Sequence, residues 1–140
     1  MISAYPDLER VKALLAAAQL PVEDLTPAHC RDFFFTGSPA APTGLVGLEI
    51  LGDVALLRSL VVTPTGRNAG AGTALVRHAE DHARTHGVRG LYLLTTTAEA
   101  FFAKRGYQRA PRETAPAAIK STREFSGICP TSSAFMSKQL

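Results

Sequence analysis

The sequence of 140 residues has few of the features that mark specialised classes of protein. Its two cysteines, Cys30 and Cys129, are far apart and lack metal-ligand spacing, so we expect two free thiols rather than a disulfide or a metal site. No apolar run approaches the roughly 20 residues of a membrane span, which argues against membrane insertion. The first residues lack the basic start and apolar core of a secretory signal, and this predicts a cytoplasmic protein.

Charged residues are also few and scattered. They make up 19% of the chain, and the net charge of +3 arises without the concentrated basic stripe of a nucleic-acid-binding protein. We therefore expect no nucleic-acid partner. Hydrophobic residues at 46% are typical of an ordinary globular protein, and the length predicts a single domain over residues 1–140 with a core of its own.

What the sequence does contain is an alternation of strand-like and helix-like segments, without internal repeats. Apolar residues at helical spacing predict helices over Asp7–Ala18, capped by Asp7, and over Gly72–His86, stopped by Gly87. Two apolar runs joined by Gly52-Asp53 predict a hairpin. The predicted strands are Asp32–Thr36, Leu45–Leu51, Val54–Val62, Leu91–Thr95 and Ala134–Leu140, with short helices at Glu99–Arg105 and near Ala117–Phe125. This order predicts α/β layers around a mixed sheet.

The turn Arg67–Gly72 lies between the apolar strand Val54–Val62 and the helix that follows. A glycine turn that opens a helix directs several backbone N–H groups at one point, where the helix dipole also favours negative charge. The turn therefore predicts a phosphate-binding loop. Taken alone, the pattern is more often an ordinary strand-to-helix connection.

Two segments in sequence order resemble the GNAT superfamily of acyl-CoA-dependent N-acetyltransferases. Leu60–Gly66, with the turn and helix behind it, is similar to motif A of that family, and Leu91–Thr97 followed by Ala98–Tyr107 is similar to its fifth strand, short helix and Gly-aromatic turn. The resemblance implies an α/β (α+β) fold with a mixed, mostly antiparallel sheet, helices on both faces and a splay between the central strands, Val54–Val62 and Leu91–Thr96. It also implies acetyl-CoA as acyl donor and no metal.

The resemblance assigns most of its site residues to the cofactor. Backbone N–H groups of the turn would hold the pyrophosphate, main-chain groups of the preceding strand would pair with the pantetheine arm, and an N–H near Leu60 would meet the thioester oxygen. After the fifth strand, Phe101 would make apolar contact and Lys104 would reach phosphate. The implied cofactor residues are Leu60, Val61, Val62, Arg67, Asn68, Ala69, Gly70, Ala71, Gly72, Thr73, Thr97, Phe101 and Lys104.

Phe102 departs from the family pattern. Many members carry a tyrosine there that returns a proton to the departing CoA thiolate, and phenylalanine has no proton to give. Either water protonates the thiolate, or a hydroxyl of Tyr107, Ser59 or Thr96 does so, or the protein has lost activity. Because proton donation contributes only about 10²–10⁴ in rate, we expect an enzyme.

Glu49 is the predicted general base, because it interrupts an apolar strand where burial would raise the pKa of a carboxylate toward neutrality. The alternative is a structural ion pair with Arg58 on the adjacent strand, and both roles are compatible. Arg58, Ser59 and Thr96 are predicted to contact the substrate, with the bidentate fork of Arg58 on an anionic group. A bulge in the strand would change the direction in which Arg58 and Ser59 point.

His78, His82 and His86 recur along one helical face, a spacing that suits a metal. We interpret them instead as a solvated flank, because charged neighbours share that side of the helix and acetyl transfer of this kind needs no metal.

A further resemblance suggests the substrate. Arg58–Val62, Leu93–Thr97 and the tail from Ala115–Ile119 through Glu124-Phe125 to Cys129-Pro130 are similar to N-acetyltransferases encoded in bacterial arsenic-resistance operons. This implies a small amine-bearing acceptor, such as an amino-acid-like toxic arsenical or phosphinate. A protein or peptide N-acetyltransferase and a non-catalytic acyl-CoA-binding module stay open, and a homodimer is possible.

Overall fold

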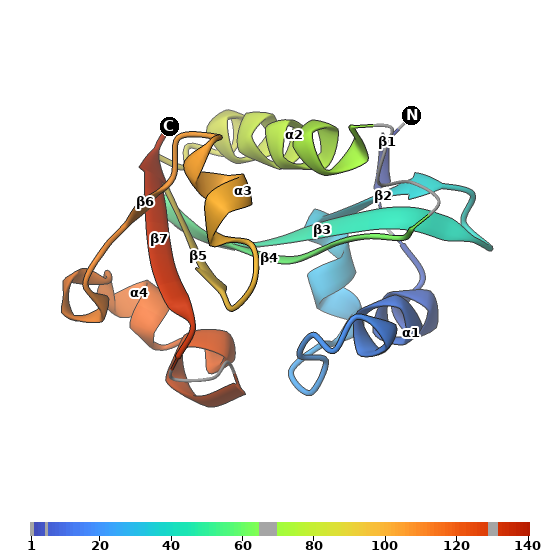
Figure 1. Ribbon diagram of the computed structural model, residues 1–140, viewed down its shortest axis with the longest axis horizontal. Helices are drawn as coiled ribbons and strands as arrows, with labels where there is room; N and C mark the ends of the chain where they lie inside the picture. Colours follow the sequence, from blue (N-terminus) through green and yellow to red (C-terminus); the bar gives the residue numbers. More distant parts are fainter. Residues whose placement is uncertain (1, 5, 65–69, 129–131) are drawn as a thin grey trace.

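The computed structural model describes residues 2–4, 6–64, 70–128 and 132–140, and these form a seven-stranded sheet (Figure 1). The strand order is β1-β2-β3-β4-β5-β7-β6, and only the β4–β5 pair is parallel among the described strands. The strands are β1 (Ile2–Ala4), β2 (Phe33–Gly37), β3 (Pro42–Leu51), β4 (Val54–Val62), β5 (Gly90–Thr95), β6 (Gln108–Arg109) and β7 (Ala134–Gln139). The helices are α1 (Leu8–Ala17), η1 (Pro27–Asp32), α2 (Ala71–Thr85), α3 (Glu99–Ala103), η3 (Arg112–Thr114), α4 (Ala117–Lys120) and η4 (Glu124–Ile128). The predicted α/β fold with a mixed, mostly antiparallel sheet is confirmed.

Local sequence signals account for most element boundaries. Asp7 caps α1 by accepting a hydrogen bond from the backbone N–H of Arg10. Gly52 has a φ of +78° in the two-residue turn between β3 and β4, a conformation that suits glycine. The predicted hairpin and the two long helices are confirmed, with ends within about two residues of the expected positions.

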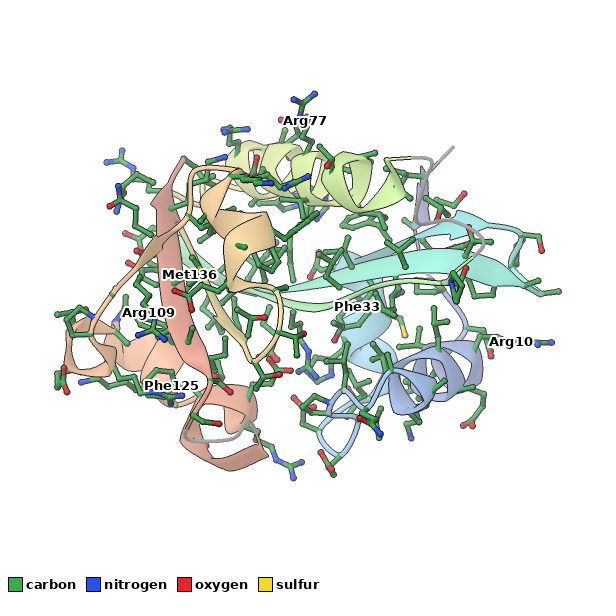
Figure 2. All side chains as sticks on the ribbon, in the orientation of Figure 1. Arg10, Phe33, Arg77, Arg109, Phe125 and Met136 are labelled. Carbon is green, nitrogen blue, oxygen red and sulfur yellow. The ribbon has the colours of Figure 1, made fainter. Side chains whose placement is uncertain are left out.

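Helices cover both faces of the sheet, as predicted (Figure 1). On one face α2 buries Leu75, Val76, Ala79 and Ala83 against β2, β3 and β4. On the other face α1 packs on β2 and β3, and Phe33 lies on that side of the sheet (Figure 2). None of the helices in the described ranges is long and apolar enough to cross a membrane.

The two central strands separate along their length. β4 and β5 pair over three residues each, where Val54–Leu56 of β4 lie opposite Gly90–Tyr92 of β5. β5 pairs with β7 on its other edge as far as Thr95. β4 also changes register against β3, because Gly47 faces Arg58 whereas Leu45 faces Val61. Ser59, in this irregularity, has a φ of +61°, which is unusual for a residue with a side chain. The predicted splay is confirmed, and the bulge turns the backbone of β4 at the point where the strands part.

The predicted helix near Ala117–Phe125 is interrupted. α4 ends at Lys120, and the chain resumes as the π-helical turn η4 at Glu124. The Oγ1 of Thr122 donates to the carbonyl of Ile119 and accepts from the N–H of Phe125, so its side chain replaces regular helical hydrogen bonds. The sequence pattern did not show this break, and Glu124, the first residue after it, is buried.

A methyl group at Gly47 tests the packing between β2 and β3. A Cβ there would lie 2.3 Å from the ring of Phe33, which is fully buried. We expect Gly47→Ala to lower the free energy of unfolding by about 1–3 kcal/mol through overpacking, as measured by urea denaturation. Gly127→Ala is the control, since no atom of the described residues lies within 4 Å of its added Cβ. Equal stability of both variants would contradict the packing described here.

Candidate functional site

A cavity of about 340 Å³ lies where β4 and β5 part. Five residues singled out from the sequence line it, namely Arg58, Ser59, Leu60, Thr96 and Thr97. Phe102 of α3 and Glu124 of η4 line it as well, together with the loop that follows α1. The fold therefore gathers residues from β4, the end of β5, α3 and the carboxyl-terminal tail around one opening.

Arg58 lies beside this cavity with its side chain fully buried and three carboxylates around it. Its Nη1 donates to both Asp24 and Glu49, the latter at 2.7 Å, while Nη2 donates to Asp24 at 2.9 Å and lies 3.2 Å from Glu124. Burial tends to raise the pKa of Asp24, but the hydrogen bond and charge of Arg58 outweigh it and lower that pKa. The bidentate fork of Arg58 is thus engaged by Asp24, and its contact with an anionic group of the substrate stays a prediction.

The ion pair between Glu49 and Arg58 that the sequence left as an alternative is present. Glu49 also lies 3.8 Å from Nε2 of His29, and its side chain is 15% exposed. Neither Glu49 nor Asp24 is among the described residues that line the cavity. The assignment of Glu49 as general base stays a prediction, and its place one side chain behind the cavity weakens it.

Glu124 was missed as a functional residue. Burial raises its pKa to about 7 against the opposing charge of Arg58, and the neighbouring Asp24 and Glu49 raise it further. Its side chain is 6% exposed and lines the cavity. The signal in the sequence is the pair Glu124-Phe125, which lies within the tail that resembles the arsenic-resistance enzymes.

The amino-terminal end of α2 and the α3 segment, both of which contain residues assigned to the cofactor, lie in contact with each other. Gly72 faces Phe101, because a Cβ on Gly72 would lie 3.3 Å from the ring. Thr73 Oγ1 accepts from the guanidinium of Arg105, which stacks 3.6 Å above the Phe101 ring centroid. Lys104 is exposed beside them.

The structure describes only part of the predicted phosphate-binding loop and of the strand before it. Gly70 has a φ of +70° and precedes α2, so glycine suits the left-handed backbone there. Ala71, Leu60, Val61 and Val62 are all half-buried. The other residues of the predicted phosphate-binding loop, Arg67, Asn68 and Ala69, lie outside the described residues.

Two of the three hydroxyls proposed to replace the missing tyrosine line the cavity. Ser59 and Thr96 do so, and Ser59 Oγ accepts from Nε of Arg58 at 3.0 Å. The prediction that Tyr107 could protonate the thiolate is wrong. Its hydroxyl is buried and donates to Glu80 at 2.9 Å, and burial raises the pKa of Tyr107. Phe102 packs edge-on between Phe101 and Tyr107, which keeps Tyr107 behind it.

The histidines of α2 are less solvated than predicted. His78 and His82 pack edge-on against Phe34, and Nε2 of His82 lies 3.0 Å from Asp32. Packing against the sheet, rather than a polar flank, therefore explains two of the three positions. Cys30 is a free, buried thiol as expected, and Cys129 lies outside the described residues.

One group of side chains in the described ranges has the composition of a metal site. It consists of Asp24, His29 and Glu49, whose possible ligand atoms lie within 4.8 Å of one another. Their arrangement suits an ion-pair network better than a metal. Arg58 donates to both carboxylates, and Nδ1 of His29 accepts from the backbone N–H of Thr26, which leaves its proton on Nε2 toward Glu49. A cation at this position would compete with a buried guanidinium.

Comparison with known proteins places the sequence in one family. Residues 11–107 match the family described as the acetyltransferase (GNAT) family. The amino-acid acetyltransferase of Pseudomonas paraeruginosa strain PA7 is 38% identical over 69 residues, which are 49% of this chain and 16% of that protein. The amino-acid acetyltransferase of Ralstonia nicotianae is 37% identical over 68 residues, 49% of this chain and 14% of that protein. This chain thus spans about a sixth of the length of the curated relatives that it matches.

Solved structures share the fold over the whole chain. N-acetylglutamate synthase from Neisseria gonorrhoeae, in complex with coenzyme A and N-acetyl-glutamate, superposes with a TM-score of 0.84 and 21% identity, covering 100% of this chain and 35% of that one. An acetyltransferase of the GNAT family from Staphylococcus aureus Mu50 superposes with a TM-score of 0.81 and 17% identity, covering 100% of this chain and 98% of that one.

Glu124 gives the stability of the fold a pH dependence. Its pKa of about 7 exceeds the ordinary value of 4.5, so between these two pH values the unfolded state has lost a proton that the folded state keeps. Stability therefore falls as pH rises through this window, by up to about 3 kcal/mol.

We expect Glu124→Gln to remove this fall, as measured by urea denaturation at a series of pH values. Glu113→Gln, an exposed position in the same tail, should keep the wild-type dependence. An unchanged pH dependence in Glu124→Gln would show that Glu124 is not the group responsible.

Proposed function

The chain belongs to the GNAT acetyltransferase family, and on that basis we propose that it transfers an acetyl group from acetyl-CoA to the amine of a small molecule. The observation that carries the proposal is the parting of β4 and β5 beyond Leu56 and Tyr92, with a cavity of about 340 Å³ in the opening. A thioester arm entering between the strands would meet β4 main-chain groups on one side and the acceptor cavity on the other.

The cofactor half of the site supports this assignment. The amino-terminal end of α2 carries no acidic residue in its first turn, and a helix start of this kind favours an anionic group. Phe101 and Arg105 stack against this end of the helix and provide an apolar and a cationic surface. We propose that the phosphates of acetyl-CoA bind at the start of α2 and that its pantetheine arm follows Leu60–Val62.

The acceptor half supplies polar groups for the reaction. In the proposed step the neutral amine attacks the thioester carbon, a C–N bond forms, the C–S bond breaks, and CoA leaves as a thiolate that takes up a proton. The backbone bulge at Ser59 and Leu60 would present an N–H to the thioester oxygen. Ser59 and Thr96 line the cavity and would provide the proton that Phe102 cannot.

The acceptor that we propose is a small amine of amino-acid type. The relatives named amino-acid acetyltransferases share about half of this chain, and the cavity volume suits a small molecule better than a peptide segment. Toxic amino-acid analogues of the arsenical or phosphinate kind, suggested by the resemblance to arsenic-resistance enzymes, belong to the same chemical class.

The proposal is tested by CoA release from acetyl-CoA in the presence of single amines, detected with a thiol reagent. The panel contains L-glutamate, L-glutamine, L-phenylalanine, phosphinothricin and an unrelated lysine-containing peptide. We expect release with at least one small amine and none above background with the peptide. Saturable binding of acetyl-CoA without release of CoA in the presence of any amine would favour the non-catalytic acyl-CoA-binding module. Phe102 is the residue that favours this alternative.

Ala71→Glu separates cofactor binding from folding. Ala71 is the first residue of α2, where a glutamate suits the helix dipole but repels a phosphate bound at the same end. We expect this variant to retain its melting temperature and to bind acetyl-CoA at least about tenfold more weakly by calorimetry, since the like-charge contact costs on the order of 1.4 kcal/mol. Ala71→Gln, of equal size without charge, is the matched control. Equal affinity of the two variants would place the phosphates elsewhere.

A further inference from the structure

The cluster beside the cavity holds more negative than positive charge. Asp24, Glu49 and Glu124 surround the single guanidinium of Arg58, and each of the three is within 3.2 Å of it. The three carboxylates come from three separate parts of the chain, the loop after α1, β3 and η4, while Arg58 comes from β4. Full ionisation would leave two uncompensated negative charges in a buried place, which is costly unless a proton or a cation neutralises them.

The three carboxylates differ in their access to the cavity. Asp24 is held by two hydrogen bonds from Arg58 and Glu49 by one, and neither is among the described residues that line the cavity. Glu124 has the longest contact with the guanidinium, 3.2 Å, and it lines the cavity. Among the described carboxylates of the cluster, Glu124 alone can therefore touch a molecule bound there.

We propose that Glu124 is the group that receives the proton of the acceptor's ammonium, so that the acceptor enters the cavity as a cation. This inference rests on the proposed acetyl transfer and names the base for it. The ammonium group first neutralises part of the excess negative charge of the cluster. Its proton then passes to a carboxylate oxygen of Glu124, which leaves the nitrogen lone pair free to attack the thioester.

The proton balance of the reaction follows from this assignment. The acceptor loses one proton to Glu124 before attack, and its nitrogen loses a second proton when the tetrahedral intermediate collapses. One proton ends on the CoA thiol and the other returns from Glu124 to solvent. No oxidant, metal or further reactant is needed.

The charged neighbours of Glu124 explain why it suits this role near neutral pH. Asp24 and Glu49 oppose its ionisation and Arg58 favours it, while burial holds its pKa at about 7. A base that titrates near the operating pH is deprotonated often enough to accept a proton and basic enough to hold it. Glu23 also lines the cavity, but it is exposed and solvent screens it.

The test is the pH dependence of kcat/KM between about pH 5.5 and about pH 9, with L-glutamate or phosphinothricin as acceptor, whichever releases CoA faster. In the wild type, log kcat/KM should rise with unit slope and level off above about pH 7, because the reactive pair is ionised Glu124 with the ammonium form of the acceptor. In Glu124→Gln the value should be about 10²-fold lower, and the rise should continue toward the pKa of the amine without levelling off near 7.

Three controls separate a catalytic role from a structural one. Glu113→Gln should keep the wild-type profile, and Glu124→Asp should restore a levelling-off near neutral pH at reduced rate. Acetyl-CoA affinity should be unchanged in Glu124→Gln. A levelling-off near pH 7 that persists in Glu124→Gln would overturn the assignment of the base while leaving acetyl transfer intact. A wild-type protein that releases no CoA with any amine of the panel would overturn the proposed function, and the inference with it.

Discussion

The separation of β4 from β5 is the constraint on which the rest of the structure depends. A strand in the middle of a sheet must satisfy its backbone N–H and C=O groups on both edges, and β4 gives up one of these edges beyond Leu56. β5 keeps its pairing through β7, which runs beside it to Thr95, while β4 bulges at Ser59 against β3. The opening is thus stabilised from both sides and leaves a cavity within the sheet.

Arg58 joins the segments that surround this opening. It lies on β4 just before the bulge, and its contacts reach the loop after α1 through Asp24, β3 through Glu49 and the tail through Glu124. Removal of one partner from a buried ion pair leaves an unpaired charge, so the four segments depend on one another for their charge balance. Through Arg58 and Glu124 the same cluster also sets the charge at the cavity lining.

The two halves of the site use different physical means. In the proposed site the cofactor half would rely on the start of α2 and on main-chain groups of β4, where glycine and alanine leave room for a close approach. The acceptor half relies on buried side chains whose ionisation depends on their neighbours.

Much of the fold could be predicted from the sequence, whereas the residues assigned to the cofactor stay a prediction. Helical spacing, the Asp7 cap and the Gly52-Asp53 turn are local signals, and the predicted hairpin and long helices follow from them. Glu124 was missed because the Thr122 side chain interrupts the expected helix, and Tyr107 was misplaced because its hydroxyl turns to Glu80. The sequence by itself determined the two long helices, the hairpin of β3 and β4 and the family motifs, since these depend on residues close together along the chain. Only the tertiary structure decided which carboxylate lines the cavity and at what pH it ionises, because burial and the charges of Arg58, Asp24 and Glu49 come from distant segments.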